Sequence, residues 1–317
     1  MILRLPCVIL VVSLCCSRVE GQQVATYAQY MFNGLAINPA YAGSQGALSA
    51  TALARFQNVG LRGAPNTQTF ALHSPLLNKR VSLGMLVIHD QLSVINQTGI
   101  HFSYAYRIPV RKHANNTATL SFGLQGGVSM YNARYTELDL YSNSPANPNP
   151  GTDVAFSQDI REARPNIGAG VYYSQSNAYL GISMPSLINN AFDRGEGFQT
   201  VYQSIPVIIT GGYVFPLNTL VKVKPNFLFK TIDNRPIEFD VNANFLFDEV
   251  LWAGVSYKSS RQIALITQVK LSDQLQFGYS YSISAGPVRT VELGSHEIML
   301  NYRFWFNEKG VVSPRYF

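Results

Sequence analysis

The sequence has few charged residues, no cysteine after position 16 and no long apolar run beyond its first residues. Lys, Arg, Asp and Glu make up only 13% of the 317 residues. After the N-terminal stretch, no segment has the roughly 18 uninterrupted apolar residues that a membrane helix needs. A sustained helical apolar period is missing as well. These absences argue against a helical membrane protein and against a fold built on long amphipathic helices.

The position of the cysteines excludes several kinds of site. Cys7, Cys15 and Cys16 lie in a stretch with the form of a signal peptide. Arg4 supplies its positive start, and its apolar core over residues 8–16 is too short to span a bilayer. We expect cleavage after residue 21. The mature chain then has no thiol, and therefore neither disulfides nor a Cys-based metal or redox site.

The basic excess is modest and scattered. The formal net charge is +6, with small groups of basic residues at 79–80, 107–112 and 222–224. This pattern is weak evidence for nucleic-acid binding, and we expect no nucleic-acid partner. It fits better a basic rim that faces anionic lipid head groups or an acidic protein.

What the sequence does contain is short segments of strict alternation. In DQLQFGYSYSISA (273–285), Leu275, Phe277, Tyr279, Tyr281 and Ile283 alternate with Gly, Gln and Ser. Successive side chains of a strand point to opposite faces, so one face is aromatic and the other small and polar. In a soluble sandwich the aromatic face looks inward, whereas in a membrane barrel it looks outward at lipid.

Fourteen such segments follow one another. They are 47–58, 67–76, 81–90, 97–107, 117–130, 165–174, 177–184, 203–215, 220–232, 236–247, 250–258, 261–271, 273–285 and 295–306. Several have about the 9–11 residues that a tilted strand needs to cross hydrocarbon. The number is even, as in bacterial outer-membrane barrels.

The connections also alternate in length. Those after even-numbered segments are short, as at 76–80, 175–176, 248–249 and 272, with 108–116 as the exception. Those after odd-numbered segments include long ones at 58–66, 131–164, 185–202 and 286–294. Outer-membrane barrels have short periplasmic turns and longer outer loops, whereas a sandwich has no reason for this pattern.

We therefore predict an all-β protein, a transmembrane antiparallel β-barrel of about 14 strands with an N-terminal pre-barrel segment. The expected divisions are a signal peptide (1–21), the pre-barrel segment (22–46), an outer-membrane β-barrel (47–306) and a periplasmic C-terminal tail (307–317). The aromatic stripes should face lipid. The lumen should be lined by Gly, Ser, Gln and Asn with few charges. A pair of secreted β-sandwiches is the alternative fold.

The pre-barrel segment does not alternate and has too many aromatic residues for a solvated tail. Two interpretations stay open: a plug or strap packed against the barrel, and a docking peptide for a partner. The tail 308–317 ends in a basic and aromatic group and is either a contact for a partner or a strap under the barrel. The candidate partner-binding residues are Tyr30, Phe32, Asn38, Pro39, Tyr41, Arg315, Tyr316 and Phe317.

Several stretches resemble one known family. They are YMFNGLAINPAYAGSQGALSATALARFQ, GAPNTQTFALHSPL, SLGMLVIHDQLSVINQTGIHFSYAYR, HEIMLNYRFWF and the terminal SPRYF. They resemble the PorP/SprF family of outer-membrane proteins of the type IX secretion system, over about residues 27–107 and again at the C-terminus. The middle of the chain, about 131–202, is not distinctive.

The resemblance implies a role that alternation cannot show. Members are outer-membrane barrels of the secretion or gliding-motility machinery that work with its periplasmic ring components, lipoprotein subunits among them. Some assist the export or surface attachment of secreted cargo with a type B C-terminal sorting domain. The resemblance implies such partners here, together with outer-membrane lipid. It does not distinguish a core secretion component from a paralogue dedicated to one cargo.

A solute channel and a hydrolase are the alternative functions. A passive channel for small solutes would need an open lumen, and rings of charge are expected of a selective pore. A hydrolase would need catalytic side chains, yet none of the five histidines has a metal-binding spacing such as HExxH. The adjacent pair His89 and Asp90 is better read as a strand cap or a loop contact than as part of a triad. We therefore predict neither an enzyme nor a cofactor.

Overall fold

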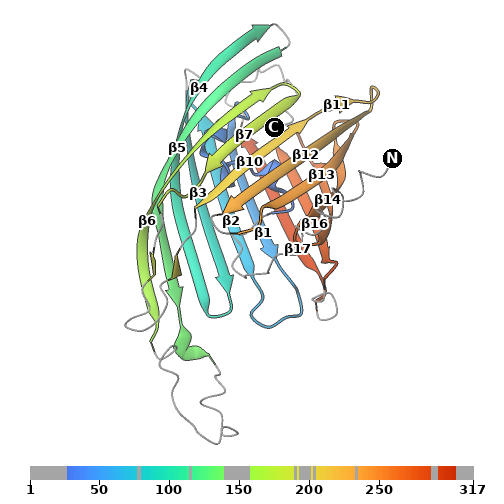
Figure 1. The fold of residues 1–317 in the computed structure, drawn as a ribbon. Coiled ribbons are helices and arrows are strands. Elements are labelled where there is room, and N and C mark those ends of the chain that lie inside the picture. Colours follow the sequence, from blue (N-terminus) through green and yellow to red (C-terminus); the bar gives the residue numbers. More distant parts are fainter. Residues whose placement is uncertain are drawn as a thin grey trace, which may run out of the picture.

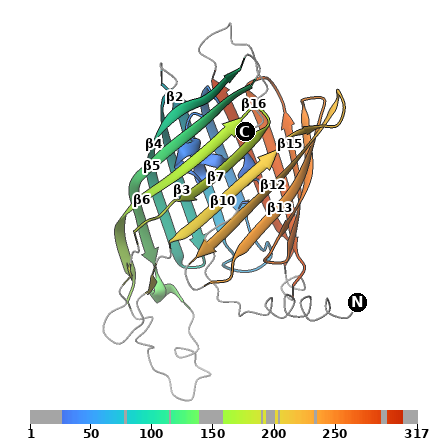
Figure 2. The same ribbon diagram turned by 45° about the horizontal axis from the view of Figure 1, so that its top comes forward.

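The alternating segments form one closed sheet. The computed structural model describes residues 27–76, 80–113, 116–138, 158–188, 191–192, 201–202, 205–232, 235–286 and 292–304. Fourteen strands pair antiparallel in sequence order around a barrel, which Figures 1 and 2 show from two directions. They are β1 (Leu48–Phe56), β2 (Asn66–Pro75), β3 (Val81–Leu92), β4 (Ile95–His113), β5 (Asn116–Ala133), β6 (Ile160–Gln175), β7 (Ala178–Met184), β10 (Pro206–Tyr213), β12 (Val221–Ile232), β13 (Glu238–Phe247), β14 (Leu251–Lys258), β15 (Gln262–Lys270), β16 (Leu275–Ser284) and β17 (Ser295–Phe304).

Closure comes from the first and last strands. β1 pairs with β17 from Leu48 opposite Phe304 to Phe56 opposite His296. β10 joins the two halves by pairing with both β7 and β12. The short β11 (Phe215–Pro216) extends this edge along β12, and β8 (Ala191–Phe192) pairs only with β9 (Val201–Tyr202). A closed ladder gives every strand two neighbours, which is what hydrocarbon requires of the backbone. Within the described residues, no helix is long and apolar enough to cross a membrane.

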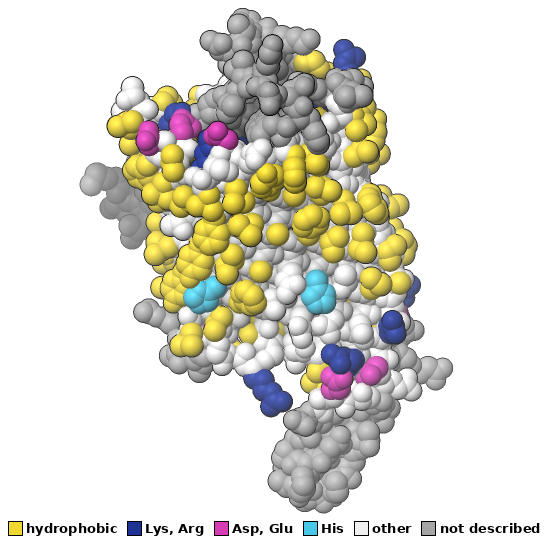
Figure 3. Space-filling model, turned by 180° about the vertical axis from the view of Figure 1, so that it is seen from behind, with side chains coloured by type: hydrophobic (Ala, Val, Ile, Leu, Met, Phe, Trp, Pro, Cys, Tyr) yellow, Lys and Arg dark blue, Asp and Glu magenta, His cyan; other side chains and the backbone are white. Residues whose placement is uncertain are grey.

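The two faces of the wall are as the alternation predicts. In β16, Phe277 and Ile283 are exposed on the outside, whereas Ser280 and Ser282 are buried toward the lumen. Other outward side chains, such as Leu265 at 59% exposure, would be unfavourable in water. Figure 3 shows hydrophobic side chains covering the middle of one face, with charged side chains near its two ends. The predicted lipid-facing surface is thus confirmed, and the sandwich alternative is wrong.

The two rims follow from strand direction. β1 starts and β17 ends at the same rim, where the short even-numbered connections also lie. By the usual length rule this rim faces the periplasm and the opposite rim the outside. We call them the periplasmic rim and the outer rim.

One predicted loop is wrong. The sequence predicts a connection at 108–116, but β4 continues to His113 and β5 begins at Asn116. Pairing of β4 with β3 ends at Tyr106, so Pro109 lies beyond the last β3 partner and next to a register shift in the pairing with β5. Pro109 pairs with Thr119 on β5 but has no partner on the β3 side, and a proline is tolerated at such an open edge.

Candidate functional site

The segment before β1 lies inside the barrel. Residues 27–47, here called the plug, form three short 3₁₀ helices: η1 (Tyr30–Phe32), η2 (Gly34–Ala36) and η3 (Pro39–Tyr41). Their turns appear within the ring of strands in Figures 1 and 2. Most plug side chains are nearly inaccessible, including Gln29 at 0% and Leu35 at 1%. Of the two interpretations of this segment, the structure shows the plug.

Local sequence determines the path of the plug. Asn38 caps η3: its Oδ1 accepts the backbone N–H of Ala40 at 2.9 Å, and Pro39 occupies the first helical turn, where its missing N–H costs nothing. Gly43 then takes a φ of +71°, a left-handed conformation that glycine adopts without strain. Its N–H donates to His73 Nδ1, and its carbonyl accepts from Arg107 Nη1 at 2.5 Å. The chain turns here into β1.

The wall around η3 is shaped to receive it. Asn38 Nδ2 donates to the backbone carbonyls of Val171 on β6 and Ile182 on β7, at 3.0 and 3.3 Å. A Cβ on Gly170 would lie 2.1 Å from Asn38 Oδ1, and one on Gly123 would lie 2.2 Å from the backbone nitrogen of Ala40. Side chains at these two positions would displace η3 from the sheet.

The start of the plug is held by a buried carboxylate. Glu297 on β17 accepts the backbone N–H groups of Ala28 at 2.7 Å and Gln29 at 3.1 Å. Arg55 on β1 lies 3.4 Å from the same carboxylate, and both side chains are almost completely buried. Hydrogen bonds to a charged acceptor are stronger than neutral ones, and burial makes this anchor costly to break.

Two apolar clusters pack the plug against the wall. In the first, plug residues pack with side chains of β1, β10, β12, β15 and β17, including Leu53, Ile266 and Met299. In the second, they pack with side chains of β2, β3, β4, β6 and β7, including Leu86. The plug therefore contacts walls on both sides of the lumen.

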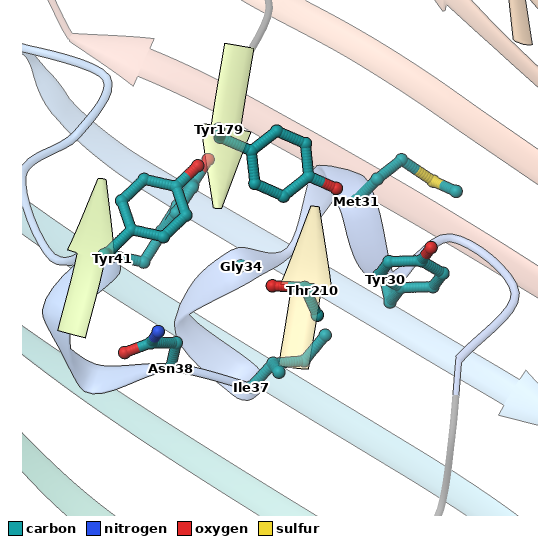
Figure 4. A pocket seen from close by; sticks show the side chains of 9 residues that line it. Tyr30, Met31, Gly34, Ile37, Asn38, Tyr41, Tyr179 and Thr210 are labelled. Carbon is teal, nitrogen blue, oxygen red and sulfur yellow. The ribbon is translucent and has the colours of Figure 1, made fainter. Parts of the chain in front are cut away.

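A small cavity lies beside the plug. It has a volume of about 20 Å³ and is lined by the plug and by Tyr172, Tyr179 and Thr210 (Figure 4). That volume is close to the space of one water molecule. Tyr30 lies at its edge and its hydroxyl accepts a hydrogen bond from Asn242 at 3.0 Å. Burial, followed by the nearby Tyr179 and Asp240, raises the pKa of the Tyr30 phenol well above its ordinary value, so the phenol stays neutral.

The lumen carries more charge than the sequence led us to expect. Besides the pair of Arg55 and Glu297, Lys258 lies 3.7 Å from Asp240 and Lys230 lies 2.6 Å from Glu238. All but Glu238 are almost completely buried. The prediction of few lumenal charges is wrong. Each strand contributes only one or two charged side chains to the lumen, and their partners lie on neighbouring strands, so the ion pairs are not visible within any one segment of the sequence.

The predicted site residues fall into two groups. Tyr30, Asn38, Pro39 and Tyr41 are buried within the plug, and Phe32 is partly buried against the wall. The structure thus gives these side chains partners within the chain, and their role in binding another protein stays a prediction. Residues 315–317 lie outside the described residues.

The adjacent residues His89 and Asp90 bind to different neighbours and not to each other. His89 Nδ1 lies 2.8 Å from Thr98 Oγ1 on the neighbouring strand, and Asp90 accepts a hydrogen bond from Thr67 at 2.6 Å. Each of the two side chains thus has its own partner on a neighbouring strand, and His89 makes a cross-strand contact rather than the strand cap or loop contact that the sequence predicts. Within the described parts of the chain, no group of three His, Asp or Glu residues is arranged to hold a metal ion.

Sequence reasoning missed the residues that position the plug. Glu297, Gly123 and Gly170 appeared only as inward positions of three alternating segments. A usable signal was present: Gly123 and Gly170 place glycines toward the lumen on neighbouring strands, which indicates that something approaches the wall there.

Comparison with protein families identifies the chain. The model of the type IX secretion system membrane protein PorP/SprF matches residues 19–302. The chain belongs to the PorP/SprF family. The resemblance drawn from the motifs is confirmed, and the match also includes the middle of the chain. With its barrel fold, this PorP/SprF protein is an outer-membrane component of the type IX secretion system.

Several solved structures match this PorP/SprF protein at low identity. The Omp33 outer-membrane protein of Acinetobacter baumannii is 7% identical, covering 81% of this chain and 98% of that one, with a TM-score of 0.43. A Pseudomonas aeruginosa FadL homologue is 11% identical over 90% and 96% of the two chains, with a TM-score of 0.44. The KdgM porin is 10% identical over 81% and 99%, with a TM-score of 0.36. No curated protein matches the chain.

Proposed function

We propose that this PorP/SprF protein works as a docking barrel. It binds periplasmic ring components of the type IX machinery at its periplasmic rim and assists the export or surface attachment of cargo with a type B sorting domain. Family membership supports a place in the machinery. The observation that carries the docking role is the plug, because a barrel whose lumen is filled acts through its surfaces.

A passive channel for small solutes is the second candidate, and the geometry disfavours it. The plug packs against both sides of the lumen, and the cavity beside it has room for about one water molecule. Solutes would pass only if the plug left its site. That movement would break the hydrogen bonds from Ala28 and Gln29 to Glu297 and those from Asn38 to β6 and β7.

Two measurements separate these candidates. The docking role predicts that the protein, purified gently from native membranes, brings down periplasmic ring components identified by mass spectrometry. Deleting residues 308–317 should leave a folded, heat-modifiable barrel and reduce that capture if the tail contributes to docking. The channel role predicts steady conductance of the unaltered protein in planar bilayers. Conductance without any captured ring component would reverse our choice.

The cargo role needs a separate test. Cells that lack the protein should release or retain cargo with a type B sorting domain differently from wild-type cells, while cargo of the other sorting class is unaffected. Equal secretion and surface attachment of type B cargo in both strains would refute this part of the proposal.

A further inference from the structure

A groove lies at the outer rim, on the outside of the barrel wall. It has a volume of about 340 Å³ and is lined by the loop between β1 and β2 and by the outer ends of β1, β2 and β3. The strand residues that line it, Phe56, Asn66 and Gln91, are outward members of the alternation. Their neighbours Arg55 and Thr67 are buried toward the lumen. The groove therefore belongs to the membrane side of the wall and not to the lumen.

Backbone hydrogen bonds fix the path of the loop (57–65). Val59 exchanges two of them with the segment before β17, at 2.7 and 2.8 Å, and the N–H of Ser93 donates to the carbonyl of Gly63 at 3.0 Å. Asn58 and Ser93 take φ values of +46° and +54°, a left-handed conformation that residues other than glycine adopt rarely. Such conformations persist where the surroundings determine them, and they cluster at binding sites. The groove is thus formed before a ligand binds, which lowers the entropic cost of binding.

The polar groups that line the groove are uncharged. Gln57, Asn66 and Gln91 contribute amides and Ser93 a hydroxyl, and no charged residue is among the described residues that line it. Asn66 Oδ1 is buried and has no hydrogen-bond partner within the described chain. An amide presents donors beside an acceptor, and neighbouring hydroxyls of a sugar do the same. A ligand hydroxyl would give Asn66 Oδ1 the partner that it lacks. This chemistry suits a saccharide.

The outward face changes from polar to apolar next to the groove. Toward the periplasmic rim, the facing outward residues of β2 and β3 are Asn66 and Gln91, Gln68 and His89, then Phe70 and Val87. Phe70 is 40% exposed on the lipid-facing surface. The hydrocarbon layer therefore begins near the level of Phe70, and the groove lies in the head-group layer of the outer leaflet. The ligand that this position brings to the groove is the head group of a lipid.

Aromatic side chains border the groove on the side of β17. Phe56 lies opposite His296. The ring of His296 has its centroid 5.1 Å from that of Tyr281, and its Nδ1 lies 2.8 Å from the hydroxyl of Tyr279. Rings with a polar edge are favoured at the membrane interface, and their apolar faces can pack against the C–H face of a sugar ring.

We propose that the groove binds the saccharide head group of an outer-leaflet glycolipid, such as lipopolysaccharide. The amides of Asn66 and Gln91 would bond its hydroxyls, and its acyl chains would lie along Phe70 and the apolar wall. Arg62, exposed on the loop and without an ion pair among the described residues, would pair with a phosphate of the sugar. This site is separate from the docking role, which uses the opposite rim. An extracellular peptide is the other class of ligand, and the outward position of the groove disfavours it.

The test titrates the full mature barrel in detergent micelles with purified rough-type lipopolysaccharide and measures binding by native mass spectrometry. The variant with Asn66→Leu and Gln91→Leu loses both amides but keeps side chains of similar size, and it should bind roughly tenfold more weakly. Arg62→Gln should also weaken binding, whereas the matched control Arg261→Gln, at another exposed turn of the outer rim, should not. Phosphatidylglycerol, which is anionic but has no saccharide, should bind the double variant and the unaltered protein equally. Heat modifiability of each variant shows that it is folded.

A second measurement identifies the ligand in intact cells. A photo-crosslinking amino acid in place of Gln91 should give adducts that stain for lipopolysaccharide. Adducts with protein alone would show a peptide-binding groove and refute the proposal. Equal lipopolysaccharide binding by the unaltered protein and the double variant would also refute it. A tenfold loss of phosphatidylglycerol binding in the double variant would show a general lipid site and overturn the assignment of a saccharide.

Discussion

The Glu297 anchor allows the sharpest test of the plug. Glu297→Ala removes the carboxylate that accepts the N–H groups of Ala28 and Gln29 and leaves Arg55 buried without that carboxylate. Breaking one side of a buried ion pair costs about 3–5 kcal/mol. Most of that cost falls on the contact between plug and wall, because the backbone ladder from β1 to β17 does not use this side chain. The opening equilibrium of the plug's first turn should therefore rise by a factor of roughly 100–1,000.

Hydrogen exchange measured by mass spectrometry gives the assay. The peptide that contains residues 27–33 should exchange much faster in Glu297→Ala than in the unaltered protein, whereas strand peptides should not. Glu238→Gln is the control, since Glu238 on β13 pairs with Lys230 at 2.6 Å rather than with the plug. The double variant Glu297→Ala, Arg55→Ala lacks the arginine as well as the carboxylate. Fast exchange of residues 27–33 in this variant would therefore come from the lost acceptor of the Ala28 and Gln29 N–H groups and not from a buried cation. Unchanged exchange of residues 27–33 in both variants would refute the anchor.

Three further predictions follow from the same geometry. Gly123→Val places a side chain on the backbone of Ala40 and should raise bilayer conductance from zero while heat modifiability persists; a silent, folded variant would contradict the role of this glycine. Leu265→Arg, on the lipid-facing surface, should lower the free energy of unfolding from lipid vesicles by about 2–4 kcal/mol in urea titrations, and Leu265→Ala by much less. In the mature chain, which we expect to be free of cysteine, Arg261→Cys should react with an impermeant maleimide in intact cells and Ser272→Cys only after the outer membrane is permeabilised; the reverse pattern would invert the orientation.

The wall of this protein was predictable because its determinants are local. The alternation in segments such as 273–285 shows which side chains share a face of the sheet. The alternation of short and long connections indicates that the strands form an outer-membrane barrel. Errors occurred where local signals pointed the wrong way. Pro109 reads as a strand breaker, yet it lies past the last β3 partner, where a missing N–H costs nothing.

The lumen was not predictable in the same way. The sequence indicates that the pre-barrel segment (22–46) is too aromatic to be a solvated tail, but it leaves plug and docking peptide equally open. The choice depends on Glu297, Gly123 and Gly170, which lie far from the plug along the chain and on three different strands. Their complementarity to the plug exists only after the ring has closed.

The sequence by itself determined the strand count, the lipid-facing stripes and the family, because period-2 alternation and short motifs are properties of neighbouring residues. Tertiary structure alone decided that the plug lies inside the barrel and that buried charges of the outer half are paired across neighbouring strands. Those features arise from side chains brought together across strands, and the free energy of burying a charge or excluding water depends on all of them at once.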